Sequence, residues 1–264
     1  MRQTSSTLER AILLLDCFTE DEPFLGVREA ARKAGLSSST TGRIFSTLKD
    51  LGMLYQDPET QKYTLAGKVL AWAEIYSATL DVRKIAQPFI HDLQQVTGET
   101  VSLYVQEGGN RVCVERLESN QNVRVVARIG RNIPLYTGSA GKLFLAYLPE
   151  EERDAIINST DLEPLTPYTI TDSEQLRQQA LIIQKQGYSI SHREWTIDAS
   201  GVSAPIFNQQ GKVIAALTVS GPTQRFNQTS MVKFTAACKQ TADEISKLLG
   251  YSSQQHNFKH YPEQ

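Results

Sequence analysis

The sequence has few of the features that mark secreted, membrane-spanning or metal-dependent proteins. Its only cysteines are Cys17, Cys113 and Cys238, an odd number at no metal-ligand spacing. This usage favours free thiols in a reducing compartment over disulfides or a metal cluster. No apolar run approaches the roughly 18 residues of a membrane span, and no basic-then-apolar leader opens the chain. These absences predict a cytoplasmic protein without a membrane partner.

Residues for catalysis are also scarce. His192 lies near Glu194, but no serine or cysteine stands in a strand-to-helix elbow where a histidine would activate it. His256 and His260 are four residues apart in a polar tail and have no acidic partner there. The sequence therefore predicts no catalytic site, no metal site and no cofactor.

The charge is nearly balanced, with a formal net charge of −2. Residues 1–64 hold eight Lys/Arg and nine Asp/Glu, which gives −1, whereas residues 23–50 hold five and two, which gives +3. A small basic region neutralises few phosphates, so one such module would bind DNA weakly. We therefore expect several copies to act together if the chain binds DNA.

The stretch from Gly26 to Leu65 has a distinctive pattern. Apolar residues at helical spacing predict a helix over 27–34, Gly35 suits the left-handed residue that ends it, and a second helix is expected over 38–51. Ser37 or Ser38 can cap this second helix. Two short strands, 53–56 and 62–65, then surround a turn at 57–60. This is the pattern of a winged helix-turn-helix.

The exposed face of the second helix carries hydroxyl side chains followed by one arginine. Free N–H groups and hydroxyls at a helix start bond phosphates, and an arginine can bond a guanine edge in the major groove. We therefore interpret the domain as DNA-binding; the alternative is a purely structural helical hairpin. The candidate DNA-binding residues are Arg28, Ser37, Ser38, Ser39, Thr40, Thr41, Arg43 and Lys62.

Two further helices are expected around this domain. A first helix places Leu8, Ile12, Leu15 and Phe18 on one stripe, which we expect to face the core. A later one, over residues 65–78, is too apolar for a bare linker. It either joins two domains or packs on its own domain.

Residues 81–250 change to a mixed pattern. Strands are expected at 101–105, 111–117, 123–128, 188–191, 202–207 and 213–220, with helices between and around them. A mostly antiparallel sheet of about six strands flanked by helices is an α+β fold. The polar tail, residues 251–264, is expected to be disordered, as is the arm at residues 1–5.

The run Gly138-Ser-Ala-Gly-Lys142 superficially resembles a phosphate-binding loop. Tyr136 stands where such a loop needs glycine, and Leu143 where it needs Ser or Thr. What remains is a small-residue turn that opens a helix, whose free N–H groups form an anion site. Thr218 and Ser220 alternate on one strand, so both hydroxyls face one side. The alternative is that all these groups satisfy only local hydrogen bonds.

Three separated segments resemble one known family. GLSSSTTGRIFSTLKDLGML, IGRNIPLYTGSAGKLFLAYL and GYSISHREWTIDASGVSAPIFNQQGKVIAALTVSGPTQRF look like the isocitrate-lyase-regulator (IclR) family of bacterial transcription factors, in order and spacing, over roughly residues 6–250. The resemblance implies a winged helix-turn-helix at 1–64, a linker helix at 65–80 that contributes to dimerisation, and a GAF/PAS-like effector-binding domain at 81–250.

The resemblance also implies a ligand site. Positions matching Ser139 and Ala140 bind the carboxylate of the effector through backbone, and the further matching positions are Ser191, Gly201, Thr218 and Ser220. Small-acid sensors of the family carry an acidic residue at position 191 and a cysteine at 201, so this chain is expected to have a roomier, less polar lining. Trp195 could cover a larger or aromatic ligand.

Together these observations predict a ligand-responsive regulator that binds double-stranded operator DNA as a homodimer or homotetramer. A small carboxylate effector, a sugar acid or an aromatic acid, would modulate it. Repression of a catabolic operon is preferred because it is common in the family. The alternative is a small-molecule-processing enzyme with a winged-helix interaction domain.

Overall fold

The computed structural model describes residues 6–19, 21–78, 81–125 and 128–252. The chain divides into two compact units, Met1–Thr79 and Leu80–Gln264. The arm expected at residues 1–5 lies outside the described residues, as does the tail from residue 253 onward. Among the helices of the described ranges, none has the length and apolar character needed to cross a membrane.

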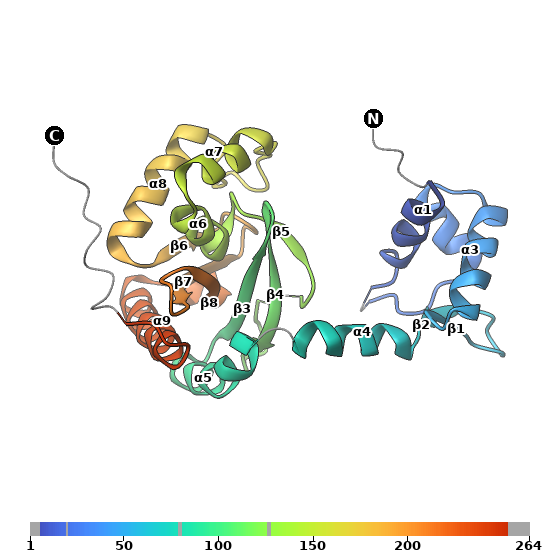
Figure 1. Ribbon diagram of the computed structural model, residues 1–264, viewed down its shortest axis with the longest axis horizontal. Helices are drawn as coiled ribbons and strands as arrows, with labels where there is room; N and C mark the ends of the chain where they lie inside the picture. The colour runs from blue at the N-terminus through green and yellow to red at the C-terminus, as the bar shows by residue number, and fades with distance from the viewer. Residues whose placement is uncertain (1–5, 20, 79–80, 126–127, 253–264) are drawn as a thin grey trace. The chain divides into compact units, whose positions relative to one another are not determined.

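The first unit contains three helices, a two-stranded wing and a fourth helix that follows the wing (Figure 1). Phe45 stands at its centre, with its ring centroid 5.8 Å from that of Phe18 and 4.8 Å from that of Tyr63. The elements are α1 (Ser6–Leu15), α2 (Val27–Ala34), α3 (Ser38–Asp50), β1 (Leu54–Gln56), β2 (Tyr63–Leu65) and α4 (Gly67–Ala78).

The turn between α2 and α3 forms as the sequence predicts. Gly35 adopts a left-handed conformation with φ of 64°, which costs a residue without Cβ nothing. Ser37 adopts an extended conformation, and its Oγ accepts a hydrogen bond from the Thr40 N–H at 3.2 Å. Of the two candidate capping residues, Ser37 is therefore the one that caps α3.

The expected core stripe of α1 is wrong in part. Leu8 and Ile12 are 68% and 54% exposed, whereas Leu14 is completely buried. The inward face of α1 is therefore rotated away from Leu8 and Ile12. A short helix with apolar residues on more than one side does not specify its buried face by spacing alone.

Helix α4 leaves three large apolar side chains exposed, although Val69 near its start packs against the core of the first unit. Leu70, Trp72 and Ile75 are 66%, 53% and 66% exposed. Packing on its own domain, the alternative considered above, therefore does not account for these residues. Together with Leu8 and Ile12 of α1, they leave the first unit with an unusual amount of exposed apolar surface.

The second unit is built on one six-stranded antiparallel sheet in the order β5-β4-β3-β8-β7-β6. The fold is therefore α+β. Its elements are α5 (Asp81–Thr97), β3 (Thr100–Glu107), β4 (Asn110–Leu117), β5 (Asn132–Pro134), α6 (Gly138–Tyr147), α7 (Glu150–Ser159), α8 (Ser173–Gln186), β6 (Ser189–His192), β7 (Ala199–Phe207), β8 (Val213–Pro222), a 3-10 turn (Thr223–Arg225) and α9 (Gln228–Leu248).

The two faces of the sheet are covered by different helices (Figure 1). Helices α5 and α9 pack on the face that carries Val101, Leu103 and Leu217. Helix α6 lies on the opposite face, with α8 packed against it. This second face is partly polar, because Ser102, Ser203 and Thr218 alternate with the apolar residues of the first.

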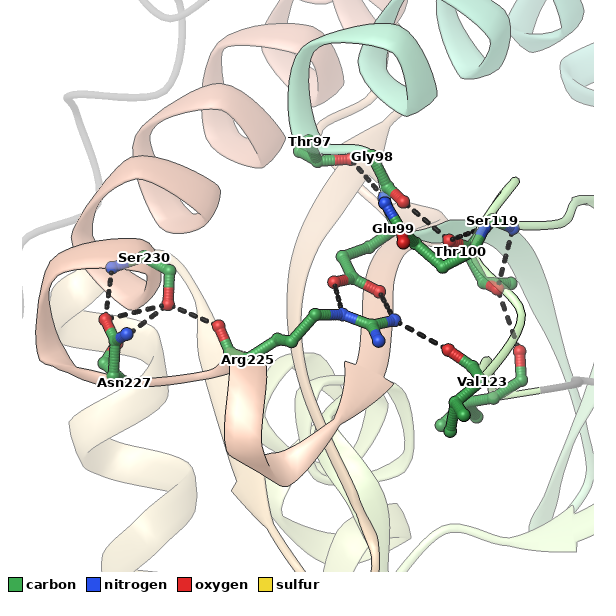
Figure 2. Close-up of polar contacts among 11 residues, drawn as sticks. Thr97, Gly98, Glu99, Thr100, Ser119, Val123, Arg225, Asn227 and Ser230 are labelled. Carbon is green, nitrogen blue, oxygen red and sulfur yellow. Dashed lines mark hydrogen bonds and ion pairs between the residues drawn. The ribbon is translucent and has the colours of Figure 1, made fainter.

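The strand expected at 123–128 is wrong for the residues of it that the structure describes. The strand that pairs with β4 at this edge of the sheet is instead β5, at Asn132–Pro134. The main-chain carbonyls of this segment accept hydrogen bonds from side chains and not from a neighbouring strand. Thr100 Oγ1 donates to the Val125 carbonyl at 2.8 Å, and Arg225 Nη2 donates to the Val123 carbonyl at 3.0 Å. Figure 2 shows the Arg225 contact, with Arg225 also bonded to both carboxylate oxygens of Glu99 at 2.5 and 2.7 Å.

Two helical glycines allow a matched stability test. A Cβ on Gly42 of α3 would meet only Val27 Cγ1, at an ordinary 3.7 Å, whereas a Cβ on Gly141 of α6 would lie 2.5 Å from the Leu135 carbonyl oxygen. We expect Gly42→Ala to raise the free energy of unfolding of the first unit by about 0.5–1 kcal/mol. Gly141→Ala should destabilise the second unit by about 1–3 kcal/mol.

Urea unfolding of the full chain measures the change in the free energy of unfolding, and amide hydrogen exchange shows which unit is affected. Loss of stability in Gly42→Ala would contradict the open space described at that position.

Candidate DNA-binding surface and ligand pocket

The start of α3 presents small hydroxyl side chains to solvent. Ser38 and Ser39 are exposed and Thr40 is half-buried. The Ser37 hydroxyl lies 3.1 Å from Ser39 Oγ and 2.9 Å from Thr40 Oγ1, so the group forms a connected set. Since N–H groups in the first turn of a helix have no intrahelical acceptor, this end suits a phosphate group.

Thr41 must be removed from the candidate DNA-binding residues. Its side chain is completely buried, and its Oγ1 has no hydrogen-bond partner. It occupies an inward position of α3 beside the buried Ile44 and Phe45, so it cannot reach a nucleic acid that docks on the exposed face.

The two candidate arginines are available for a ligand. Arg43 follows Ser39 by four residues, so both lie on one face of α3, and Arg43 is exposed. Arg28 is exposed on α2. Neither guanidinium is ion-paired with any residue of the described ranges. An unpaired guanidinium on a helix face can bond a base edge without first breaking another contact.

Lys62 is less available than the sequence indicates. Its Nζ lies 3.4 Å from Glu29 Oε2. Glu29 also accepts a hydrogen bond from the Gly26 N–H at 2.8 Å, and this bond and Lys62 together lower the pKa of its carboxyl. A DNA phosphate would therefore compete with Glu29 for the Lys62 ammonium.

The second unit contains a cavity of about 330 Å³. It opens between the start of α6, the start of β7, the end of β8, and residues 124–125, 128–133 and 195–198. All six candidate ligand residues lie on its wall. They are Ser139, Ala140, Ser191, Gly201, Thr218 and Ser220.

The start of α6 already holds one anionic group. The Gly138 N–H donates to Glu194 Oε2 at 3.3 Å, and Gly138 has the positive φ of 73° that the entry turn requires. The N–H groups of Ser139 and Ala140 come next in the first turn, where a helix offers no internal acceptor. Ser139 and Ala140 both lie on the cavity wall, so their N–H groups are candidate donors to an anion.

Arg111 of β4 lies beneath this helix start, and sequence reasoning missed it. Its Nη1 donates to the carbonyls of Pro134 and Thr137 at 2.9 and 2.6 Å. A Cβ on Gly138 would lie 2.7 Å from Arg111 Nη2, and one on Gly141 would lie 2.6 Å from Nη1. The glycines of the GSAGK run therefore leave room for the guanidinium.

The electrostatics of Arg111 are unusual. The side chain is buried, and burial lowers the pKa of its guanidinium to about 10, so it stays charged at neutral pH. Its Nε has no hydrogen-bond partner, and the guanidinium carbon lies 5.5 Å from the Tyr104 ring centroid. The nearby Glu194 carboxylate acts against this lowering of the pKa, but it forms its ion pair with Lys142. A buried cation without an ion-paired carboxylate of its own favours an anion beside it.

Lys142, the residue that suggested a phosphate loop, points to other partners. Its Nζ forms an ion pair with Glu194 Oε1 at 2.5 Å and donates to the Ile190 carbonyl at 2.9 Å. It is buried and is not part of the cavity wall. Within the described ranges, no three His, Cys, Asp or Glu side chains are grouped closely enough to hold a metal ion.

A buried hydroxyl chain links the start of α6 to the sheet. Ser203 Oγ lies 2.8 Å from Ser139 Oγ and 2.8 Å from Thr218 Oγ1. Ser203 is completely buried and pairs with Thr218 across β7 and β8. Its alternation with Gly201 along one strand was the signal that could have identified it.

The lining at Gly201 is closely packed, and the cavity wall as a whole is cationic. A Cβ on Gly201 would lie 3.1 Å from the Val219 carbonyl oxygen and 3.3 Å from Ser139 Oγ, so little space is left there. The cavity wall also carries Arg111, Arg124, Arg128 and Arg131. Three of these arginines fall within the short run VRVVARIGR, a cluster that the sequence displays openly.

Trp195 lies on the cavity wall, as its proximity in sequence to Ser191 suggested. Its ring centroid is 5.0 Å from the guanidinium carbon of Arg131. The indole is half-buried, so it offers an apolar face within an otherwise cationic cavity.

Comparison with known proteins assigns both units. Residues 7–58 match the IclR helix-turn-helix domain, and residues 75–247 match the C-terminal domain of the bacterial transcriptional regulator IclR. The chain is 32% identical to the HTH-type transcriptional regulator KipR of Bacillus subtilis, over 96% of this chain and all of KipR. It is 30% identical to the HTH-type transcriptional repressor AllR of Escherichia coli, over 93% of this chain and 91% of AllR.

A solved structure of similar fold contains a ligand. It is an IclR homolog from Microbacterium hydrocarbonoxydans complexed with 4-hydroxybenzoate, with 27% identity and a TM-score of 0.79 over 92% of this chain and 99% of that one. These relatives are DNA-binding regulators, so the alternative of an enzyme with a winged interaction domain does not hold. The chain belongs to the IclR family of bacterial transcriptional regulators.

Proposed function

We propose that this chain is a repressor of a catabolic operon whose DNA binding is modulated by a small organic acid bound in the second unit. One observation carries the proposal: the start of α6, two strand hydroxyls and Arg111 meet on one cavity. Each of these groups is a donor or a positive charge, so their common ligand is an anion. The repressor AllR and the 4-hydroxybenzoate complex of an IclR homolog support the two halves of the proposal.

The DNA contact is assigned to the exposed face of α3, with the wing beside it. Ser37, Ser38, Ser39 and Thr40 would bond phosphates near the helix start, and Arg43 would reach a base edge in the major groove. Arg28 and Lys62 would add contacts to the backbone of the duplex. Acting on DNA, the protein would work in the cytoplasm.

The mechanism is a population shift. A ligand moves a protein between two arrangements only through its different affinity for them. The organic acid would therefore bind more tightly to the arrangement that releases operator DNA than to the one that binds it.

The active form is a homodimer or a homotetramer. The basic region of +3 over residues 23–50 is too small for strong binding by one copy. Leu8 and Ile12 of α1 and Leu70 and Ile75 of α4 are each more than half exposed, which is the apolar surface that a second copy would cover. Paired modules would read half-sites about one helical turn apart.

The assembly is tested by analytical sedimentation. We expect a dimer or tetramer at micromolar concentration and loss of assembly when Leu70 and Ile75 are both changed to Glu, with weaker operator binding as the consequence. The double change Leu181→Glu/Ile182→Glu on α8, also exposed, is the control. A monomeric wild type with undiminished operator affinity would rule the assembly out.

Base reading by Arg43 is tested by gel mobility shift on the upstream DNA of the gene. Arg43→Ala should cost about 1–3 kcal/mol on the specific site and much less on random DNA. Equal losses on both DNAs would mean that Arg43 contacts only phosphate. Arg32→Ala, which removes the same charge from an exposed position of α2, is the control.

The position of the pocket is tested by calorimetric titration of sugar acids, aromatic acids and short 2-oxo acids. Ala140→Leu should abolish binding, because the larger side chain fills the place assigned to the carboxylate. Thr218→Val with Ser220→Ala should cost about 1–3 kcal/mol for each donor lost. Ser139→Ala should change little, since the backbone donors remain.

DNA binding without ligand serves as the control for folding, and all three variants should retain it. The pocket assignment fails if Ala140→Leu responds as the wild type does, or if a neutral compound binds most tightly.

A further inference from the structure

The cavity carries more positive charge than one carboxylate balances. Four arginines and one aspartate, Asp198, lie on its wall, which gives a formal charge of +3. Neither lysine nor glutamate belongs to the wall. Glu118 outside the wall pairs with Arg124, so the positive charge that a ligand could balance is chiefly that of Arg111 and Arg131. A ligand with a single negative charge would balance only one of these two arginines.

Two of the arginines differ from the others in their partners. Arg124 is ion-paired with Glu118 at 2.6 Å. Arg111 donates only to main-chain carbonyls, and Arg131 lies over the Trp195 ring. Neither Arg111 nor Arg131 pairs with a carboxylate among the residues that the structure describes. Both guanidinium groups are therefore suited to anions that come from outside the chain.

Arg111 and Arg131 stand at different places in the cavity. Arg111 pairs with Ile133 across β4 and β5, and the Gly130 N–H continues this pairing by donating to the Cys113 carbonyl at 2.8 Å. Arg131 precedes Ile133 by two residues and lies just outside β5, and both residues line the cavity. Arg111 is buried whereas Arg131 is exposed, which places one in the interior and the other at the mouth.

We propose that the ligand is a dicarboxylate, with one carboxylate at the α6 start beside Arg111 and the second at the mouth on Arg131. This inference rests on the proposed function, since it concerns the same pocket. It assigns to Arg131 the role of selecting a dianion over a monoanion.

The geometry around Arg131 fits that role. The Arg131 guanidinium lies over the Trp195 ring, a contact that uses the face of the group, and a guanidinium edge can make two parallel bonds to a carboxylate. The cavity wall also includes Tyr104 beside Arg111, Trp195 beside Arg131, and Ile133, so the body of the ligand would meet apolar and aromatic surface. A benzene-1,4-dicarboxylate or an aliphatic diacid of similar length has this sequence of acid, apolar body and acid.

The test compares acids that differ only by the second carboxylate. Isothermal titration of the full chain uses benzene-1,4-dicarboxylate against 4-methylbenzoate, and hexanedioate against hexanoate, at neutral pH. We expect at least one diacid to bind tenfold or more tightly than its matched monoacid. Arg131→Gln should remove most of this preference by weakening the diacid at least tenfold, with less than a threefold effect on the monoacid, and Arg131→Lys should restore part of it.

Arg177→Gln on α8 is the control, because it removes one positive charge away from the cavity and should leave both affinities unchanged. Equal affinity for diacids and monoacids would overturn the inference while leaving an organic-acid effector in place. Equal weakening of both acids by Arg131→Gln would overturn it as well. If neither class of acid binds and a neutral compound does, the proposed function fails and the inference fails with it.

Discussion

The arrangement of the ligand pocket depends on one buried cation. Arg111 crosses under the first turn of α6, where the carbonyls of Pro134 and Thr137 hold it. Its volume requires glycine at positions 138 and 141, and its charge lies beside the positive end of the α6 dipole. Two positive features are thus brought together without a carboxylate on Arg111 itself. The carbonyl dipoles and the Tyr104 ring offset part of the free-energy cost of burying this charge.

Glu194 neutralises Lys142, the second buried cation near the start of α6. It pairs with Lys142 and accepts the Gly138 N–H, so one acidic side chain neutralises the lysine of α6 and caps the helix. The remaining donors of the first turn are left for a ligand. The GSAGK run therefore has a structural explanation for Gly138, Gly141 and Lys142, and a proposed functional one for Ser139 and Ala140 alone.

Much of the fold follows from sequence because local signals are strong. Gly35 and Ser37 mark the turn before α3, and period-two alternation marks β7 and β8. The face of α1 and the strand expected at 123–128 did not follow, since both depend on contacts distant in sequence. The carbonyl of Val123, for example, is used by Arg225, about a hundred residues away.

The pocket was predictable in the same uneven way. The six candidate residues were identified because the family resemblance extends over their positions in the chain, and the fold brings all six to the cavity. Thr41 was misassigned for its hydroxyl, although it precedes the buried Ile44 and Phe45 by three and four residues and so lies on the buried face of α3. Arg111 was missed because a lone arginine in a strand resembles any surface residue.

The hydrogen bonds that hold residues 123–125 of the cavity wall affect how such proteins can diversify. This wall is held by side chains, Thr100 and Arg225, that bond its carbonyls, and Glu99 fixes Arg225 in turn (Figure 2). Those bonds use the main chain of the wall, so they are indifferent to the side chains that it carries. Substitutions at positions such as Arg124 can therefore accumulate without disturbing the sheet. Lineages that inherit this scaffold can change the lining of the cavity while the fold that carries it stays the same.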